Sequence, residues 1–135
     1  MRIDQSLMAL ERHITRRWRE EGDPSGISLT YTEYDYLQTL EEAGTRRLSD
    51  LAQVMGVSKP TASNMVKRLE RKALVRRQGC AEDGRAVILS LTEQGQQLLA
   101  QDRRLYRQLV DELLAHLGEA ERAQLAGLLA RLVRR

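Results

Sequence analysis

The sequence predicts a mainly α-helical fold with a small β-hairpin, and three observations support this prediction. Apolar residues recur every three or four positions over most of the 135-residue chain, as they do on one face of a helix. Between about residues 74 and 91 this period is lost, and Val75, Val87, Leu89 and Leu91 instead occupy alternate positions on either side of an Asp-Gly pair, which is typical of a hairpin. The chain contains no phenylalanine, so Leu, Val, Ala and Met must fill the core, and this composition favours helices.

Composition and length exclude several classes of protein. The chain has no run of about 18 apolar residues and no charged-then-apolar signal pattern at its N-terminus, so we expect a cytoplasmic protein without a membrane partner. The single cysteine, Cys80, cannot form an intramolecular disulfide or, by itself, a structural zinc site. A core built from so few residues is thin unless a partner covers it, and oligomerisation is therefore expected.

Positive charge is concentrated in the middle of the chain. Residues 46–85 contain ten basic and four acidic residues, a net charge of +6, whereas the rest of the chain carries a small negative charge. This excess suits a partner that bears phosphates, because each neutralised phosphate releases condensed counterions and so strengthens binding. A merely solvated basic face is the alternative that charge alone leaves open.

Two helices are expected before the basic region. One apolar stripe marks the first of them: Ile3, Leu7, Leu10, Ile14 and Trp18. The turn-forming residues 22–26 end this helix. Thr30 and Glu33 have the spacing of a capping box and predict a second helix that ends at about Ala43, before Gly44. We expect Tyr34, Leu37 and Leu40 to face the core.

Residues 48–73 have the pattern of a helix, a tight turn and a second helix. The expected buried stripe of the first helix is Leu48, Leu51, Ala52 and Met55. Gly56 is expected to close that helix in the left-handed conformation, and Ser58 to cap the next one. The inward face of the second helix is expected to be Ala62, Met65, Val66, Leu69 and Ala73.

The remaining positions of this second helix are polar or basic. They are Pro60, Thr61, Ser63, Asn64, Lys67, Arg68 and Arg71. Such a face suits the major groove of DNA, because short polar groups reach base edges and cationic groups bind phosphates. An ordinary surface helix is the alternative interpretation.

A β-hairpin is expected directly after this helix. Residues 74–80 and 86–91 predict two strands joined by a turn at Asp83-Gly84, with Val75, Val87, Leu89 and Leu91 facing inward. Residues 45–47 give a weaker signal for a short third strand. A hairpin that follows such a helix makes the predicted fold a winged helix-turn-helix.

At this point the chain resembles the MarR (multiple antibiotic resistance regulator) family of transcriptional regulators. The wing carries Asp83-x-Arg85 and, after five residues, Leu91-Thr92, which matches that family's D-x-R…L-T pattern, and residues 48–52, 57–61 and 68–70 also agree with it. The resemblance implies a transcriptional regulator that binds double-stranded DNA sequence-specifically. Such a regulator would be a homodimeric repressor that binds a pseudo-palindromic operator, and a small ligand would relieve the repression. The resemblance also implies that Asp83 orients Arg85 along the minor groove. A simple exposed ion pair is the alternative for these two residues.

The expected DNA-binding residues therefore lie on the second helix of the motif and on the wing. They are Ser58, Lys59, Pro60, Thr61, Ser63, Asn64, Lys67, Arg68, Arg71, Arg76, Arg77, Asp83 and Arg85.

The C-terminal part of the chain predicts two more helices. Thr92 is expected to cap a long helix that continues through Leu117 until Gly118 breaks it. A last helix is marked by Leu125, Leu128, Leu129, Leu132 and Val133. The expected organisation is a dimerisation helix and loop (1–27), a winged helix-turn-helix domain (28–92) and C-terminal dimerisation helices (93–135).

No catalytic residue, cofactor or metal site is expected, because the sequence lacks the glycine-rich, nucleophile and metal-ligand motifs that such sites need. The resemblance makes a small aromatic or phenolic effector a candidate partner. Trp18, Tyr31, Tyr34 and Tyr36, with Arg12 or Arg17, are candidates to line a crevice for it, although plain packing is the alternative. The sequence identifies no ligand.

Two alternative functions remain open at this stage. The first is a redox-responsive regulator that acts through Cys80, whose pKa the nearby Arg76, Arg77 and Arg85 would lower if the thiol is exposed. The second is a winged-helix module that binds protein rather than DNA. That module would carry an apolar or acidic outward face on the helix from Ser58 to Ala73, whereas this face is polar and basic.

Overall fold

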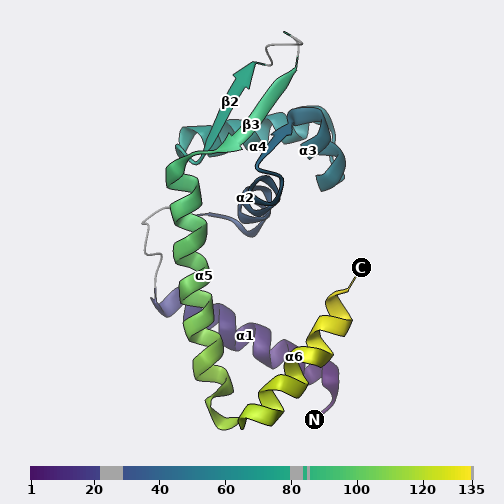
Figure 1. Cartoon of the computed structure of the whole chain (residues 1–135), viewed down its shortest axis with the longest axis vertical. Helices are drawn as coiled ribbons and strands as arrows, with labels where there is room; N and C mark the ends of the chain where they lie inside the picture. Colours follow the sequence, from purple (N-terminus) through teal and green to yellow (C-terminus); the bar gives the residue numbers. More distant parts are fainter. Residues whose placement is uncertain (22–28, 80–83, 85, 135) are drawn as a thin grey trace. The chain divides into compact units, whose positions relative to one another are not determined.

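A computed structural model describes residues 1–21, 29–79, 84 and 86–134, and the helices and strands in these residues confirm the predicted mainly helical winged-helix fold (Figure 1). The elements in chain order are α1 (Ile3–Glu21), α2 (Tyr31–Ala43), β1 (Thr45–Arg47), α3 (Leu48–Met55), α4 (Lys59–Arg71), β2 (Val75–Gly79), β3 (Val87–Leu91), α5 (Glu93–Leu113), a 3₁₀ turn η1 (Leu114–His116) and α6 (Glu119–Val133).

The chain divides into two compact units. One consists of Met1–Gly22 and Arg103–Arg135, and the other is Asp23–Asp102. Helix α5 begins in the second unit and ends in the first. The second unit contains the whole helix-turn-helix and the sheet, and we call it the winged-helix unit. The first contains α1, α6 and the end of α5, and we call it the terminal unit. The dimerisation roles assigned to residues 1–27 and 93–135 stay predictions.

The core of the winged-helix unit is built from small and medium aliphatic side chains around one tyrosine. Its fully buried members include Leu37, Leu40, Leu51, Val66, Leu69, Leu74, Leu89 and Leu99. Tyr36 is 2% exposed and belongs to this core, whereas Tyr34 packs against it half-buried. Tyr34 therefore contacts the core, as predicted. Tyr36, which was a candidate to line a ligand crevice, is a core residue, because it lies on the same face of α2 as Leu37 and Leu40.

The helix-turn-helix forms as predicted. Gly56 ends α3 in the left-handed conformation with φ +68°, and its N–H bonds back into the helix. Ser58 caps α4. The buried face of α4 consists of Ala62, Val66 and Leu69, with Met65 half-buried beside them.

The prediction that Ala73 continues this inward face was wrong. Helix α4 ends at Arg71, and Ala73 is exposed with φ +62°. The apolar spacing reaches Ala73, but the backbone turns out of the helix before it. Leu74, one residue later, is fully buried instead.

Three antiparallel strands form the sheet in the order β1-β3-β2, so the weakly predicted third strand is present. Arg46 and Arg77 both lie opposite Leu89, and Val75 lies opposite Leu91. Directly opposed side chains share a face of the sheet, and Leu89 and Val75 are buried. This register therefore puts Val75, Arg46 and Arg77 on the core face and Arg47 and Arg76 on the outer face.

Helix α5 starts where predicted but ends earlier. The Thr92 hydroxyl accepts the Gly95 N–H at 3.0 Å and so caps it. Regular α-helix ends at Leu113 and passes through η1 to an extended Leu117, so the predicted continuation to Leu117 was wrong. Gly118 is the N-cap position of α6, and its N–H donates to Glu121 Oε1 at 2.9 Å.

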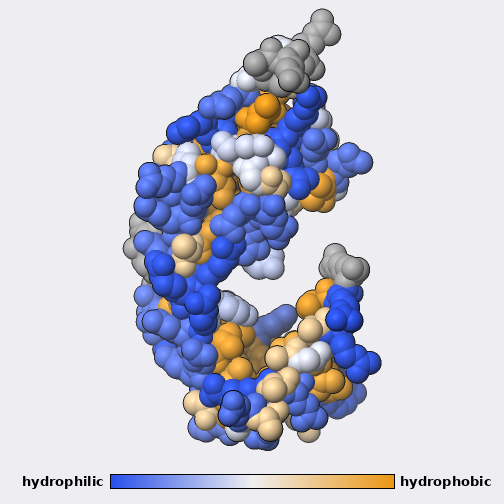
Figure 2. Space-filling model, viewed as in Figure 1, coloured by the Kyte–Doolittle hydropathy of each residue, from blue (hydrophilic) through white to orange (hydrophobic). Residues whose placement is uncertain are grey.

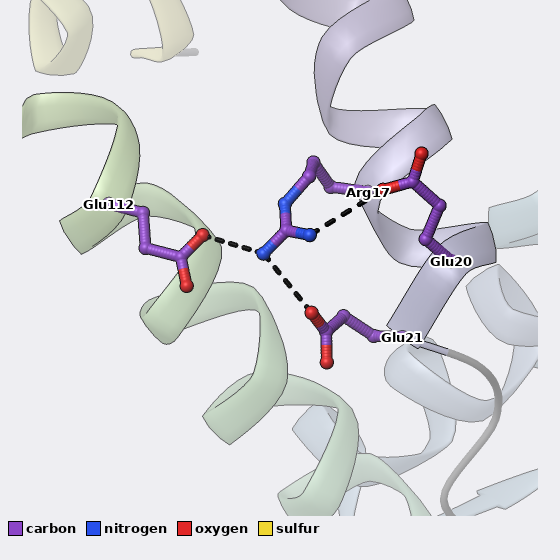
Figure 3. A network of polar contacts seen from close by, with 4 residues as sticks. All are labelled: Arg17, Glu20, Glu21 and Glu112. Carbon is purple, nitrogen blue, oxygen red and sulfur yellow. Dashed lines mark hydrogen bonds and ion pairs between the residues drawn. The ribbon is translucent and has the colours of Figure 1, made fainter.

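In the terminal unit, an ion-pair network joins α1 to α5 (Figure 3). Arg17 Nη2 lies 2.8 Å from Glu112 Oε2 and 3.1 Å from Glu21 Oε1, and Arg17 Nη1 lies 3.5 Å from Glu20 Oε2. The hydrogen bond and the charge of Glu112 raise the pKa of Arg17, so the guanidinium stays charged. Beside this network, the rings of Trp18 and Tyr106 pack in a tilted arrangement with centroids 6.4 Å apart.

The helices in the described part of the chain are all too short or too polar to cross a lipid bilayer.

Candidate nucleic-acid interface

Helix α4 has two faces of opposite character. Its inner side chains, Ala62, Val66 and Leu69, are fully buried against the core. The residues on the opposite side are exposed: Lys59, Pro60, Thr61, Asn64, Lys67, Arg68 and Arg71. Four of these seven residues carry positive charge, and none carries negative charge. The hydrophobic face therefore fixes the helix in place while a cationic and amide-bearing face remains open to a partner.

The N-terminus of α4 is fixed by a local cap. Ser58 Oγ accepts the Thr61 N–H at 3.2 Å and donates to Thr61 Oγ1 at 2.9 Å. Pro60 stands in the first turn, where its missing N–H costs nothing. Two of the predicted DNA-binding side chains, Ser58 and Thr61, are thus engaged with each other. Asn64, one turn further along, is exposed, whereas Ser63 is half-buried.

The two adjacent arginines of β2 have different environments. Arg76 is exposed on the outer face of the sheet. Arg77 lies on the core face, its side chain is 28% exposed, and its Nε lies 3.0 Å from Glu70 Oε1 of α4. This ion pair holds the start of β2 against α4. It does not favour a phosphate contact by Arg77, although both residues were predicted to bind DNA.

The sheet adds a cation that the sequence prediction omitted. Arg47 lies opposite Ile88 and is exposed, on the same face of the sheet as Arg76. The two-residue period of a strand was the available signal, because it separates Arg76 from Arg77 and Arg46 from Arg47. The predicted third strand had only three residues, which was too short to assign Arg46 and Arg47 to opposite faces of the sheet.

A partly buried ion pair lies at the other end of α4. Lys72 Nζ is 2.6 Å from Glu33 Oε2, and Glu33 Oε1 accepts the Thr30 N–H at 3.3 Å. Burial raises the pKa of Glu33, but the hydrogen bonds from Lys72 and Thr30 and the charge of Lys72 outweigh it, and the net pKa lies below its ordinary value. Sequence reasoning found Glu33 as a capping residue but not its pairing with a lysine 39 positions away.

Three residues singled out from the sequence, Cys80, Asp83 and Arg85, lie outside the described residues. Within residues 1–21, 29–79, 84 and 86–134, no three His, Cys, Asp or Glu side chains gather in a way that would hold a metal ion.

Comparison with known proteins gives one consistent result. The model of the MarR family matches residues 29–87. The uncharacterized HTH-type transcriptional regulator YwaE of Bacillus subtilis is 31% identical over 105 residues, which are 78% of this chain. The matched part spans about 61% of the length of YwaE.

Solved structures agree in fold. The YusO protein of Bacillus subtilis is 29% identical, with a TM-score of 0.79 over 96% of this chain and 91% of that one. FabT of Streptococcus pneumoniae, crystallised in complex with DNA, is 22% identical, with a TM-score of 0.75 over 96% of this chain and 92% of that one.

Proposed function

Because the chain belongs to the MarR family, we propose that it is a transcriptional regulator that binds double-stranded DNA sequence-specifically as a homodimer. The observation that carries this proposal is the exposed face of α4, on which Lys59, Lys67, Arg68 and Arg71 surround Asn64. Cations in such an arrangement bind phosphates and fix the register, while an amide side chain can make paired hydrogen bonds to an adenine.

The charge on this face also separates DNA from a protein partner. A protein-binding winged helix would bury apolar side chains or pair with an oppositely charged surface through α4. Here the outward residues include no large aliphatic side chain and no carboxylate. FabT, which shares this fold, was crystallised with DNA, and this supports the same class of partner.

The proposed homodimer is supported by apolar surface on the terminal unit. Ile3 is 81% exposed and Leu132 is 76% exposed, and Leu7, Met8, Leu10, Leu128, Leu129 and Val133 are also exposed. Figure 2 shows apolar residues gathered over α1 and α6 in the lower part of the view. Exposed apolar patches of this kind mark association surfaces, because their burial removes them from water.

We further propose that the dimer represses transcription by occupying a pseudo-palindromic operator, and that a small aromatic or phenolic effector relieves this repression. The family resemblance supports both proposals. Tyr31, which is highly exposed at the start of α2, is the tyrosine of that helix best placed to meet such a ligand. The roles of Asp83 and Arg85 at the wing remain predictions from the D-x-R pattern.

The test is selection of bound duplexes from a random pool at near-physiological salt. We expect enrichment of an inverted repeat whose half-sites lie about 10 base pairs apart, since a two-fold dimer places its recognition helices in successive major grooves. Recovery of duplexes without any common sequence, from a folded dimer, would contradict sequence-specific binding. Enrichment of a single half-site would contradict the dimeric arrangement but not DNA binding.

A further inference from the structure

The junction between α4 and β2 contains an unfavourable backbone conformation. Ala73 has φ +62°, and among the non-glycine residues that the structure describes it alone has a positive φ. Its N–H bonds to Glu70 O at 2.9 Å, and the Leu74 N–H bonds to Leu69 O at 3.0 Å. Since the side chain of an L-residue disfavours this conformation, contacts from elsewhere must hold the bend.

Thr92 supplies contacts to both peptide groups of the bend. Its Oγ1 donates to Ala73 O at 2.6 Å, and its backbone N–H donates to Leu74 O at 3.0 Å. The same hydroxyl oxygen accepts the Gly95 N–H in the first turn of α5. Thr92 also follows Leu91, which pairs with Val75 at the start of the wing. A single residue thus joins the end of α4, both wing strands and the start of α5.

The first turn of α5 is packed directly onto the bend, and Figure 1 shows it beside the end of α4. A Cβ at Gly95 would overlap the carbonyl oxygen of Leu74. Only glycine permits this close approach, which leaves Thr92 little freedom to move away from Ala73.

The Lys72–Glu33 ion pair described above is a second contact beside the bend. Lys72 immediately precedes Ala73, and Glu33 is fixed in turn by its capping-box bonds to Thr30. The bend is therefore attached to α2 through Lys72 and to the start of α5 through Thr92. Residues 72–74 set the angle between α4 and the wing, because α4 ends at Arg71 and β2 starts at Val75.

We propose that Thr92 is a positioning residue for DNA recognition, which fixes the angle between α4 and the wing through its bonds to Ala73 and Leu74. This inference rests on the proposed function. Specific binding requires α4 and the wing to contact one duplex in a fixed register, whereas non-specific binding needs only charge. Loss of the angle should therefore weaken specific binding and leave non-specific binding unchanged.

The test compares Thr92→Val, which keeps the shape and removes the hydroxyl, with Thr92→Ser, which keeps the hydroxyl. Thr39→Val is the matched control, because Thr39 Oγ1 also donates to a backbone carbonyl, that of Asp35 at 2.9 Å, but within α2. Each variant is titrated at one salt concentration with the selected duplex and with a random duplex of equal length. Thr92→Val removes both bonds of the hydroxyl, to Ala73 O and from the Gly95 N–H. We expect it to lower the specific affinity at least about fivefold, which is the effect of a single lost hydrogen bond. Its random-duplex affinity should be unchanged, and Thr92→Ser and Thr39→Val should match the wild type.

Two outcomes would overturn the proposal: an unchanged ratio of specific to random affinity in Thr92→Val, or an equal fall in that ratio in Thr39→Val. Amide hydrogen exchange on the free protein gives a readout that does not depend on DNA. Thr92→Val should speed exchange in β2 and β3 but not in α3, and unaltered exchange in the strands would refute the holding role of Thr92. If the wild type itself shows no preference for the selected duplex, the proposed function fails, and the positioning role fails with it.

Discussion

At the scale of single residues, Glu33 combines two tasks that usually belong to different side chains. One carboxylate oxygen completes the cap of α2, and the other pairs with Lys72 at the end of α4. The Glu33 side chain is almost fully buried, whereas that of Lys72 is one third exposed, so water competes for these bonds less than it does at the surface. Breaking a buried pair from one side leaves an uncompensated charge, which makes such a pair more costly to disturb than a surface one.

The titration of Glu33 should make the free energy of unfolding depend on pH. Because the pKa of folded Glu33 lies below its ordinary value of 4.5, its charge stabilises the fold above about pH 4.5, and this stabilisation is lost as pH falls through the lower folded pKa. Glu33→Gln should therefore cost about 1–3 kcal/mol at neutral pH, and the difference from wild type should shrink in acid. Urea unfolding at a series of pH values measures this. Glu112→Gln, which alters an exposed pair, should cost under about 1 kcal/mol, and a pH-independent Glu33→Gln effect would refute the account.

Two neighbouring positions on α4 should differ in how they affect DNA binding. Lys67→Ala should weaken binding to all duplexes and reduce the slope of log affinity against log salt by about one. Asn64→Ala should instead relax the preference at one base position, at a cost of about 1–3 kcal/mol on the preferred base. Salt-dependent titrations of single-base variants of the selected site distinguish the two. Equal losses on every sequence would rule out base reading by Asn64.

At the scale of elements, local signals were sufficient where the cause of the structure is local. The capping box of α2, the Gly56 turn and the Thr92 cap each depend on residues within four positions, and all three formed as predicted. The strands were also predictable, because alternation and one buried face determine them.

The missed features depend on contacts that the sequence does not display. Nothing local marks the end of α4 before Ala73, since the bend is held by Thr92, 19 positions later. The end of α5 at Leu113 was missed because the apolar spacing continues to Leu117 and does not distinguish α-helix from a 3₁₀ turn. In the candidate interface, the sequence did not show the pairing of Arg77 with Glu70, because Glu70 lies on a different element. The assignment of Arg77 to DNA binding stays a prediction.

Replacement by alanine should have opposite effects on stability at Gly95, which packs on the α4–β2 bend, and at Gly127 in α6. Gly95→Ala should destabilise the protein by about 1–3 kcal/mol, because the added Cβ meets backbone that cannot move aside. Gly127→Ala, within α6 where the added Cβ meets nothing within 4 Å, should stabilise by up to about 1 kcal/mol through helix propensity. Denaturant unfolding measures both. A neutral Gly95→Ala would show that α5 is free to shift from the bend.

At the scale of the whole molecule, the proposed dimer depends on the apolar surface of α1 and α6. In a single chain the exposed aliphatic side chains of both helices remain in water, and a second copy of the chain would cover them. The same association would give the protein two copies of α4, one for each half-site.

A charge placed on this surface should separate the subunits. Leu132→Glu should raise the dimer dissociation constant at least about tenfold, since burial of one leucine contributes about 1.5–3 kcal/mol and a buried carboxylate adds a further cost. Ala123→Glu is the matched control, because nine residues of helix place position 123 on the opposite side of α6. Sedimentation at a series of concentrations measures both variants. Dimers of equal stability in both would place the interface elsewhere.

The most direct measurement of the central claim is the affinity of the wild-type protein for its selected inverted repeat and for the same duplex with five base pairs inserted between the half-sites. The insertion rotates one half-site by about half a helical turn while leaving every base contact intact in sequence. A dimer that reads both half-sites with its two α4 helices should lose on the order of 100-fold in affinity. Equal affinity for the two duplexes would contradict simultaneous recognition by a two-fold dimer.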